Sequence, residues 1–479
     1  MVQTLIEVLS VEDNSDDRTF IKEVLNEVDP NARITFAYDR ESAIQTLESG
    51  FFDFMILDLR IPYSSENPLD KDPDHGVAVL GEARRLAPGL PILIFTGSEY
   101  ESLVRTLMKE GDKQDIWGCG RKKPTLDLVR KDSKSEFATE VKEIVSDIQA
   151  LGDCDHRNRS ATNLQIDADR LIRIAVRRLG GASYEVYTLG AGKSSADVFS
   201  VRVKDSSGKQ IFNLVLKIDD HAKAEDEERR YRLHAQQLNS SHTPRLLERL
   251  EYGGHGRAAI IYDLVSDAEG SLFDVAANAK KASTTLSNLA DALEPWHSID
   301  GETEMEIRQI RRTNFDDERA AAIIGSFGLD WAAALEERRV GTKNGITHGD
   351  LHGGNVLVDG EDRTALIDFN DIERRPAVFD WISLELSLLF NIDGPAREGE
   401  WPSTEQCANW ADVDAFADGS PFEAFVKECR ANASKVCTGE RELCAVAYAY
   451  LLRQFRYDDT DKERLRVLIE GVNQRLQVL

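Results

Sequence analysis

Short apolar runs alternate with amphipathic segments over the first 130 residues of the chain. A short apolar run rich in β-branched residues, which is typical of a strand, occupies residues 5–11, and further short strands are expected at 34–37, 54–57 and 91–95, of which the last two are apolar. Apolar side chains recur at helical spacing in residues 16–28, 41–47 and 77–86. Apolar strands that alternate with amphipathic helices predict a parallel sheet covered on both faces, with ligands at the carboxyl ends of its strands.

The pattern changes after the helical segment 135–151 and the polar stretch 152–163 that follows it. A second helix is predicted at 166–179, and strand signals then dominate residues 184–189, 198–203, 211–218 and 258–265. A charged helix is expected at 223–238 between the third and fourth of these strands. Beyond residue 265 the spacing is mostly helical, with an interruption at 345–371, so a strand-rich lobe precedes a helical lobe.

We therefore predict a multidomain protein that combines an α/β domain with an α+β region. The α/β domain is expected to span residues 1–150, and the polar stretch that follows is expected to act as a linker at 151–164. The strand-rich lobe would occupy 165–265 and the helical lobe 266–479. A chain of 479 residues is too long for one core, because domains usually span about 100–200 residues.

The charge of the chain excludes some partners. A net charge of −26 repels phosphate backbones and anionic lipid, so we expect neither nucleic acid nor membrane as a partner. No apolar run approaches the roughly 20 residues that a membrane helix needs. The six cysteines form no C-x-x-C pair, which gives little support to a zinc or redox site and fits a reducing compartment. These features indicate a cytoplasmic protein.

Polar residues follow the predicted strands of the first domain where each strand ends. Glu12 and Asp13 follow the first strand, Asp58 follows the third, and Thr96 ends the next. Lys123, before Pro124, is expected at the end of the last strand. An aspartate can accept a phosphoryl group if a hard cation neutralises the charge, and Mg²⁺ prefers oxygen ligands. Glu12, Asp13 and Asp58 would bind Mg²⁺, while Thr96 and Lys123 would contact the phosphoryl oxygens.

This set of residues resembles the response-regulator receiver family over roughly residues 3–150. The resemblance implies a flavodoxin-like (βα)5 fold and a phosphoacceptor role for Asp58. It also implies a metal-binding role for Glu12 and Asp13, a switch hydroxyl on Thr96 and a phosphate contact from Lys123. An upstream histidine kinase is the implied phosphodonor, and a cis peptide bond is expected before Pro124.

The sequence departs from the receiver pattern in two places. The loop 58–76 is long, and we interpret it first as a tolerated surface insertion, with shielding of the site or recognition of a partner as alternatives. The family usually has an aromatic residue three positions before its lysine, and that position here is Gly120. Trp117 is nearby but out of register, so the usual coupling between threonine and aromatic residue is not expected.

The second half contains the run Thr347-His348-Gly349-Asp350 and, after it, Asn355 and Asp368. Phosphoryl transfer needs one carboxylate to accept the proton of the attacking hydroxyl. It also needs an amide and a second carboxylate to hold Mg²⁺ against the nucleotide phosphates. We assign the base to Asp350 and the metal ligands to Asn355 and Asp368. His348 is expected to pack and donate hydrogen bonds rather than act as the base.

Residues upstream could complete a nucleotide site. Gly190 and Gly192 lie between two predicted strands, where backbone N–H groups could cover phosphates, although G-x-G alone is weak evidence. Lys217 lies in an apolar strand, where a buried lysine needs a carboxylate partner. We choose Glu228 of the following helix as that partner, with Glu225 and Glu227 as alternatives.

This half resembles the aminoglycoside phosphotransferase and choline kinase branch of the protein-kinase-like fold over about residues 180–390. The resemblance implies a two-lobed phosphotransferase that uses ATP and Mg²⁺, with Lys217, Asp350, Asn355 and Asp368 in the roles given above. It also implies that Asp380 braces the catalytic loop. Asn370 stands where many members have glycine, and asparagine tolerates a left-handed backbone there.

Together the two halves predict a two-component response regulator. Phosphorylation of Asp58 would change the shape or self-association of the receiver, so a homodimer through the receiver is compatible with this interpretation. The second half would then transfer the γ-phosphate of ATP to a hydroxyl of an unknown small molecule or protein. The alternative is a catalytically silent kinase-fold adaptor that binds nucleotide and a protein partner.

Overall fold

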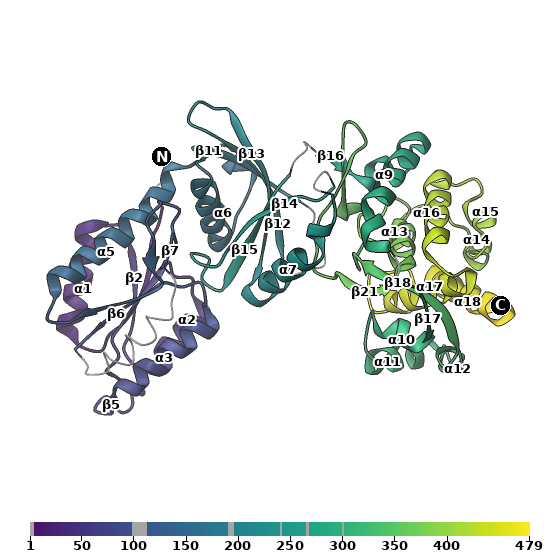
Figure 1. Cartoon of the computed structure of the whole chain (residues 1–479). Helices are drawn as coiled ribbons and strands as arrows, with labels where there is room; N and C mark the ends of the chain where they lie inside the picture. The colour runs from purple at the N-terminus through teal and green to yellow at the C-terminus, as the bar shows by residue number, and fades with distance from the viewer. Residues whose placement is uncertain (1–3, 98–112, 190–195, 240–241, 265–267, 299–300) are drawn as a thin grey trace. The chain divides into compact units, whose positions relative to one another are not determined.

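The computed structural model describes residues 4–97, 113–189, 196–239, 242–264, 268–298 and 301–479 (Figure 1). It divides into two compact units. The first unit comprises Met1–Glu228 with Leu246–Asp263, and the second comprises Arg229–Arg245 with Leu264–Leu479. The first unit therefore holds both the predicted receiver and most of the predicted strand-rich lobe. Gly190 and Gly192 lie outside the described residues.

The first sheet confirms the flavodoxin-like prediction, since its five strands are parallel in the order β2-β1-β3-β6-β9. Its strands are β1 (Glu7–Val11), β2 (Arg33–Ala37), β3 (Phe54–Leu57), β6 (Ile92–Thr96) and β9 (Leu126–Arg130). Among the described residues of this domain, the helices are α1 (Ser15–Val28), α2 (Arg40–Ser49), α3 (Pro73–Leu86) and α5 (Lys134–Gln149). Successive residues of β1 alternate between faces: Val8 joins the core against α1 and α5, and Leu9 joins the core against α2 and α3.

Two short hairpins lie outside this sheet. One pairs β4 (Ile61–Pro62) with β5 (Lys71–Asp72) inside the long loop, and the other pairs β7 (Lys113–Gln114) with β8 (Lys123–Pro124). The last strand of the parallel sheet is therefore β9, and the prediction that this strand ends at Lys123 is wrong. The cis bond expected before Pro124 is also absent, because among the described residues only Pro402 follows a cis peptide bond.

A second, six-stranded sheet follows in the order β10-β11-β12-β13-β15-β14. Its strands are β10 (Asp155–His156), β11 (Ser183–Thr188), β12 (Asp197–Lys204), β13 (Gln210–Asp220), β14 (Arg245–Leu250) and β15 (Arg257–Asp263). Helix α6 (Ile166–Arg178) precedes β11, and α7 (His221–Leu233) follows β13. The predicted strands at 184–189, 198–203, 211–218 and 258–265 all correspond to members of this sheet, whereas β10 and β14 had no strand signal.

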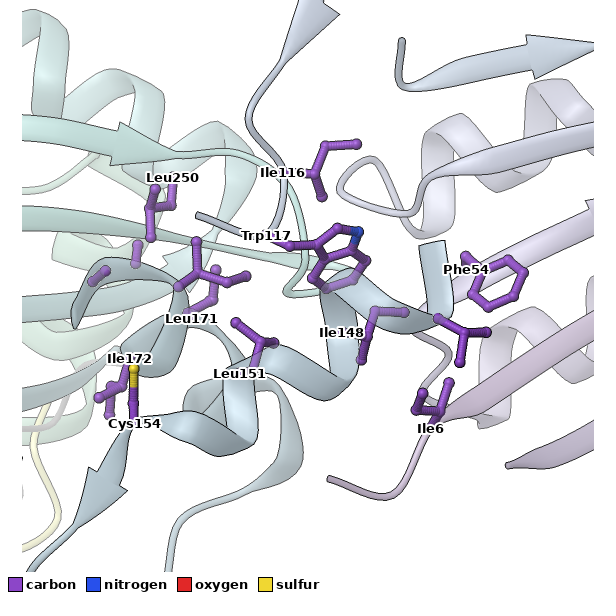
Figure 2. Close-up of a cluster of buried hydrophobic side chains, with 14 of the residues drawn as sticks. Ile6, Phe54, Ile116, Trp117, Ile148, Leu151, Cys154, Leu171, Ile172 and Leu250 are labelled. Atoms are coloured by element: carbon purple, nitrogen blue, oxygen red, sulfur yellow. The ribbon is translucent and has the colours of Figure 1, made fainter. Parts of the chain in front are cut away.

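The segment 151–164, predicted as a linker, is structured. It forms η1 (Ala150–Asp153), β10 and η2 (Arg159–Ala161), and β10 pairs in parallel with β11. One continuous apolar cluster joins this segment to both sheets (Figure 2): Ile6, Phe54 and Ile148 belong to the first domain, and Leu171, Ile172 and Leu250 to the second. Because all these side chains are buried together, the two sheets share a core.

Polar contacts reinforce the shared core. Arg170 on α6 places its Nε 2.7 Å from Asp53 Oδ1, and both side chains are buried. The N–H of Gly89 donates to the carbonyl of His255 at 2.8 Å, and the N–H of Gly253 donates to the carbonyl of Gly89 at 3.0 Å. Asp53 and Gly89 come just before β3 and β6, so these contacts lie at the amino ends of the strands. The predicted phosphoacceptor lies at their opposite, carboxyl ends.

The second unit is mainly helical, as its spacing predicted. Its longer helices are α9 (Ala279–His297), α11 (Asp317–Phe327), α13 (Val378–Phe390), α16 (Glu423–Val436), α17 (Glu440–Gln454) and α18 (Lys462–Val478). Shorter ones are η3 (Ala235–Gln237), α8 (Leu272–Val275), α10 (Ile307–Arg312), α12 (Ala332–Glu336), η4 (Gly353–Asn355), α14 (Thr404–Ala408) and α15 (Val413–Ala417). Every residue of α13 is buried, which explains its apolar sequence.

Two three-stranded sheets accompany these helices, in the orders β16-β19-β20 and β17-β18-β21. Their strands are β16 (Ala268–Ser271), β17 (Glu302–Glu306), β18 (Arg339–Thr347), β19 (Val356–Asp359), β20 (Thr364–Leu366) and β21 (Glu373–Pro376). The chain passes from β18 through η4 into β19, so the motif-bearing segment lies between the two sheets. Across the described parts of the chain, no helix combines the length and apolar character needed to cross a bilayer.

Candidate functional site

Three carboxylates meet at the carboxyl ends of β1 and β3 and form what we call the acidic pocket. One oxygen from each of Glu12, Asp13 and Asp58 lies within 4.8 Å of the others. The Thr96 hydroxyl, at the end of β6, donates to Asp58 Oδ1 at 2.7 Å, and the Arg60 N–H donates to the same oxygen at 3.1 Å. The parallel sheet thus brings four of the predicted site residues together.

The lysine of the acidic pocket is Lys131 rather than Lys123. Lys131 directly follows β9, and its Nζ lies 2.8 Å from Asp58 Oδ2 and 2.7 Å from Glu12 Oε2. Lys123 instead pairs with Glu140 at 3.0 Å and Glu143 at 2.5 Å on α5. The prediction failed because the end of the fifth parallel strand determines the position of this lysine. A Lys-Pro dipeptide does not mark that end here.

Burial and crowding shift the ionisation of this pocket. Glu12 is 1% exposed, and its burial, together with the charge of Asp58, raises the pKa of its carboxyl to about 7 against the opposing effect of Lys131. Burial alone would lower the pKa of Lys131, but the charges of Asp58 and Glu12 raise it above its ordinary value. Lys131 therefore stays charged and neutralises part of the pocket.

A second lysine reaches the pocket from the long loop. Lys71 on β5 forms an ion pair with Asp13, and Lys131 also pairs with Asp17 at 2.8 Å. The β4–β5 hairpin therefore contacts the pocket, which favours the shielding interpretation of this loop over a surface insertion without contacts. Sequence reasoning missed Lys71 because nothing in the loop marks which of its charged residues folds back.

The donor set of the acidic pocket fits Mg²⁺. Its three side chains offer only carboxylate oxygens, which are the ligands this cation prefers, and their spacing allows one ion to contact all three.

The aromatic partner of Thr96 that is usual in the resembling family is absent in the register of Lys131 as well. The position three residues before Lys131 is Leu128, which is not aromatic.

Lys217 lies in the second sheet of the first unit, on β13. Its Nζ is 3.0 Å from Glu227 Oε2, and both side chains are buried. The Tyr262 hydroxyl donates to the other oxygen of Glu227 at 2.9 Å. Glu228, the predicted partner, instead accepts from Arg249 at 2.7 Å, so that prediction is wrong and the alternative Glu227 is correct. Adjacent helix positions face different directions, which the sequence alone does not resolve.

In the second unit, Asp350 and Asn355 lie on the loop 348–355, here called the HGD loop. The Asn355 amide donates to the backbone carbonyl of Asp350 at 3.0 Å and closes the loop. Among the described residues, none donates a hydrogen bond to the Asp350 carboxylate. Asp368 follows β20 with a φ of 67°, whereas Asn370, expected to adopt the left-handed conformation, does not.

Asp380 braces the HGD loop, as predicted. Its carboxylate is completely buried at the start of α13 and accepts the N–H groups of His348 at 2.9 Å and Gly349 at 3.1 Å. His297 lies 3.1 Å away. Burial alone would raise the pKa of Asp380, but these hydrogen bonds and the nearby histidines hold it below its ordinary value. The His348 ring contacts the Ile367 carbonyl at 3.0 Å, which confirms its structural role.

Two glycines of the HGD loop allow close packing. Gly349 has a φ of 82°, and a Cβ there would lie 2.1 Å from the Asp371 carbonyl oxygen. A Cβ on Gly353 would lie 2.3 Å from the ring of Phe273. Neither position accepts a larger residue without displacement of its neighbours, so both glycines are required for this packing of the loop.

Further charged groups surround Asp350. Burial, with the charge of Asp350 next in importance, raises the pKa of Asp371. Burial alone would lower the pKa of Arg453 on α17, but Tyr457, Asp350 and Asp371 raise it above its ordinary value. Burial lowers the pKa of His352, whose Nδ1 accepts the Gly354 N–H at 3.1 Å. Arg453 had no motif to mark it, and only the fold brings it near Asp350.

Two family models match the chain. The response regulator receiver domain matches residues 8–116, and the phosphotransferase enzyme family, APH, matches residues 188–415. The first match ends before β9, so it does not include Lys131. A search of the curated proteins finds no match.

Solved structures resemble each half. A CheY-like receiver domain from Methanospirillum hungatei JF-1 is 18% identical, with a TM-score of 0.22, and the match covers 30% of this chain and 96% of that one. A receiver domain of a Pseudomonas aeruginosa PAO1 sensor histidine kinase, with magnesium in its active-site cleft, is 19% identical, with a TM-score of 0.21, over 30% of this chain and 98% of that one.

The second half resembles a thermostable mutant of aminoglycoside phosphotransferase APH(4)-Ia in a ternary complex with ADP and hygromycin B. The identity is 14% and the TM-score 0.37, with 63% of this chain and 97% of that chain covered. With the parallel sheet and the family matches taken together, this chain carries a response regulator receiver domain followed by a kinase-like domain of the phosphotransferase enzyme family.

Proposed function

We propose that the chain is a response regulator in which phosphorylation of Asp58 controls an ATP-dependent phosphotransferase in the second half. The observation that supports this most is the state of Asp350. Its carboxylate receives no hydrogen bond from a described residue, on a loop that Asp380, Gly349 and Gly353 hold in one shape. A general base must be positioned and unoccupied, and Asp350 is both.

In the receiver, Asp58 would act as the nucleophile toward a phosphohistidine of an upstream kinase. One of its oxygens would form a bond to phosphorus while the bond from phosphorus to the histidine nitrogen breaks. Thr96 and Lys131 already contact the two oxygens of Asp58 and would donate to the phosphoryl oxygens. Glu12, Asp13 and Asp58 would hold Mg²⁺, which neutralises phosphoryl charge when bound.

In the phosphotransferase half, Asp350 would accept the proton of an acceptor hydroxyl. Lys217, oriented by Glu227, would contact the phosphates of ATP, and Asn355 and Asp368 would hold Mg²⁺. The glycines at 190 and 192 stay a prediction for phosphate binding. The acceptor would bind to the helical segments at 266–344 and after Asp380, and its identity stays open. We also propose that the protein is cytoplasmic and that it forms a homodimer through its receiver domain.

The test is Mg²⁺-dependent turnover of ATP by the purified chain beside Asp350→Asn, with nucleotide binding measured on both proteins. We expect turnover to fall by about a thousand-fold, within the range of general-base catalysis, while nucleotide binding is retained. Asp330→Asn, which changes an exposed aspartate of the same unit, should behave like the wild type.

The alternative is a kinase-fold adaptor without catalysis. An adaptor would bind nucleotide equally in wild type and Asp350→Asn, and it would show no Mg²⁺-dependent turnover in either form. That outcome, if it persists after phosphorylation of Asp58, would replace the enzyme by the adaptor.

A further inference from the structure

One cavity of the first unit lies where its two sheets meet. It has a volume of about 430 Å³. Thr4 and Leu5, which lead into β1, form one side, and the segment 156–164 with the first turns of α6 forms the rest. None of the residues assigned above to phosphoryl chemistry lines this cavity. It is therefore separate from the acidic pocket, the HGD loop and Lys217.

Three arginines line the cavity against one carboxylate, Asp169. Arg170 uses its Nε and Nη2 on Asp53, while its Nη1 lies 3.7 Å from Asp169, beyond hydrogen-bond range. Arg173 uses Nε on Asp169 and Nη1 on two carbonyls, and no described group accepts from its Nη2. Arg159 is exposed at the rim and forms no ion pair with a described residue. Each guanidinium thus keeps N–H groups unused.

One residue that lines this cavity has a buried ring nitrogen without a partner among the described residues. His156 on β10 lines it and is only 9% exposed. Its ring stacks on Tyr184 with centroids 4.8 Å apart, and its Nε2 lies 3.1 Å from Asn158 Oδ1. Its Nδ1 has no partner among the described residues. Because Nε2 faces an acceptor oxygen, Nε2 carries the proton and Nδ1 is a buried acceptor. A buried polar atom without a partner is costly, so a ligand that offers a hydroxyl to Nδ1 and anionic oxygens to the arginines would fit this position.

We propose that this cavity binds a small organic phosphate of about mononucleotide size. Guanidinium groups match phosphate oxygens in geometry and charge, and three of them converge here in a chain whose net charge is −26. Ser160 and Asn163 add neutral hydrogen-bonding groups, while Leu164 and Ile166 offer an apolar wall. The volume lies within the roughly 300–1,000 Å³ of small-molecule sites.

The ligand would act at the junction between receiver and kinase-like domain. It would contact Thr4 and Leu5, just before β1, on one side and α6 on the other. Its binding would therefore stabilise the packing that joins the two sheets. A ligand that binds only the folded state raises the free energy of unfolding, and the increase grows with the logarithm of the ligand concentration above the Kd.

The experiment is isothermal titration calorimetry of the full chain with pyrophosphate, AMP and citrate, without Mg²⁺. Arg159→Glu removes the exposed rim arginine, and Arg157→Glu is its matched control, since Arg157 is exposed nearby but does not line the cavity. We expect pyrophosphate or AMP to bind saturably to the wild type and to Arg157→Glu, with at least a tenfold weaker affinity for Arg159→Glu. Thermal unfolding without ligand should be unchanged in both variants.

The remaining outcomes overturn the proposal. If Arg159→Glu and Arg157→Glu lose binding affinity equally, the probe is held by general electrostatic attraction. If both variants keep the wild-type affinity, the probe binds elsewhere, including at a nucleotide site. Binding of citrate alone would exclude a phosphate ligand. No saturable binding of any probe at millimolar concentration would show that the cavity has no such ligand.

Discussion

The acidic pocket and the HGD loop both present the carboxylates to which we assign phosphoryl chemistry, yet their charges are balanced in opposite ways. In the acidic pocket, Lys131 contacts Asp58 and Glu12, and Lys71 contacts Asp13. Every carboxylate there already has a cation. In the HGD loop, Asp350 has no hydrogen-bond donor among the described residues, and the backbone around it is fixed by the buried Asp380.

Under the proposed function, this difference would distinguish a switchable site from a preorganised one. A cation that binds the acidic pocket must displace or rearrange two lysines, so binding there changes contacts of the β4–β5 hairpin and of the segment after β9. No comparable rearrangement is needed in the HGD loop, because the buried Asp380 carboxylate and the close contacts of Gly349 and Gly353 already support its backbone. The following predictions test that contrast.

The largest effect is expected from Asp380→Asn. An amide cannot accept the N–H groups of His348 and Gly349 equally well, so we expect the second unit to lose about 3 kcal/mol of unfolding free energy and the chain to lose most of its turnover. Equilibrium unfolding in guanidinium chloride measures the loss of stability, and ATP turnover measures the loss of activity. Asp330→Asn, which changes an exposed aspartate, is the control. Unchanged turnover would show that the brace is dispensable.

The acid dependence of this variant gives a second readout. Because the folded protein holds the pKa of Asp380 below its ordinary value, its stabilisation is present above the pKa of the unfolded carboxyl. That contribution is lost as the pH falls through the lower, folded value. The stability deficit of Asp380→Asn relative to wild type should therefore shrink in acid, and a deficit that is constant with pH would contradict the assignment.

An intermediate effect is expected at the Lys217 pair. Glu227→Gln removes a charged hydrogen bond of about 1.5–3 kcal/mol, which corresponds to roughly a ten- to hundred-fold fall in ATP turnover. Glu228→Gln, one residue further along, should leave turnover near wild type because Glu228 pairs with Arg249. Equal losses in the two variants would mean that Glu227 has no specific role.

A smaller effect is expected at the β4–β5 hairpin. Lys71→Gln removes the cation beside Asp13, so the Mg²⁺ affinity of the receiver should rise by a few-fold, on the scale of about 1 kcal/mol for a partly exposed ion pair. Titration of the full chain with Mg²⁺ or Mn²⁺ measures this affinity. Lys22→Gln removes an exposed lysine of α1 and controls for net charge. A fall in affinity with Lys71→Gln would contradict a competing role.

The fold was largely predictable, because both sheets have clear apolar periodicity. Positions read directly from strand ends, such as Asp58 and Thr96, lie together in the acidic pocket. Lys131 was missed because Leu126–Arg130 carries a charged residue at its second position and lacks the continuous apolar run of a buried strand. Strand β10 has only two residues, too few for any periodicity, so the segment that joins the domains resembled a linker.

The residues of the kinase-like site also fall into those that the sequence predicts and those that depend on tertiary packing. Asp350 and Asn355 were predicted from a fixed local spacing, and Asp380 was predicted from the family resemblance. The choice between Glu227 and Glu228, and the approach of Arg453 to Asp350, depend on how helices pack, and local sequence does not encode that.

The most direct test of the account is the change in ATP turnover when the receiver is phosphorylated by a small acyl phosphate. Wild type should change its turnover on treatment, Lys123→Gln should respond in the same way, and Asp58→Ala and Lys131→Gln should not respond. If Asp58→Ala responds like the wild type, or if treated and untreated wild type turn over ATP at the same rate, the receiver does not control the phosphotransferase through Asp58.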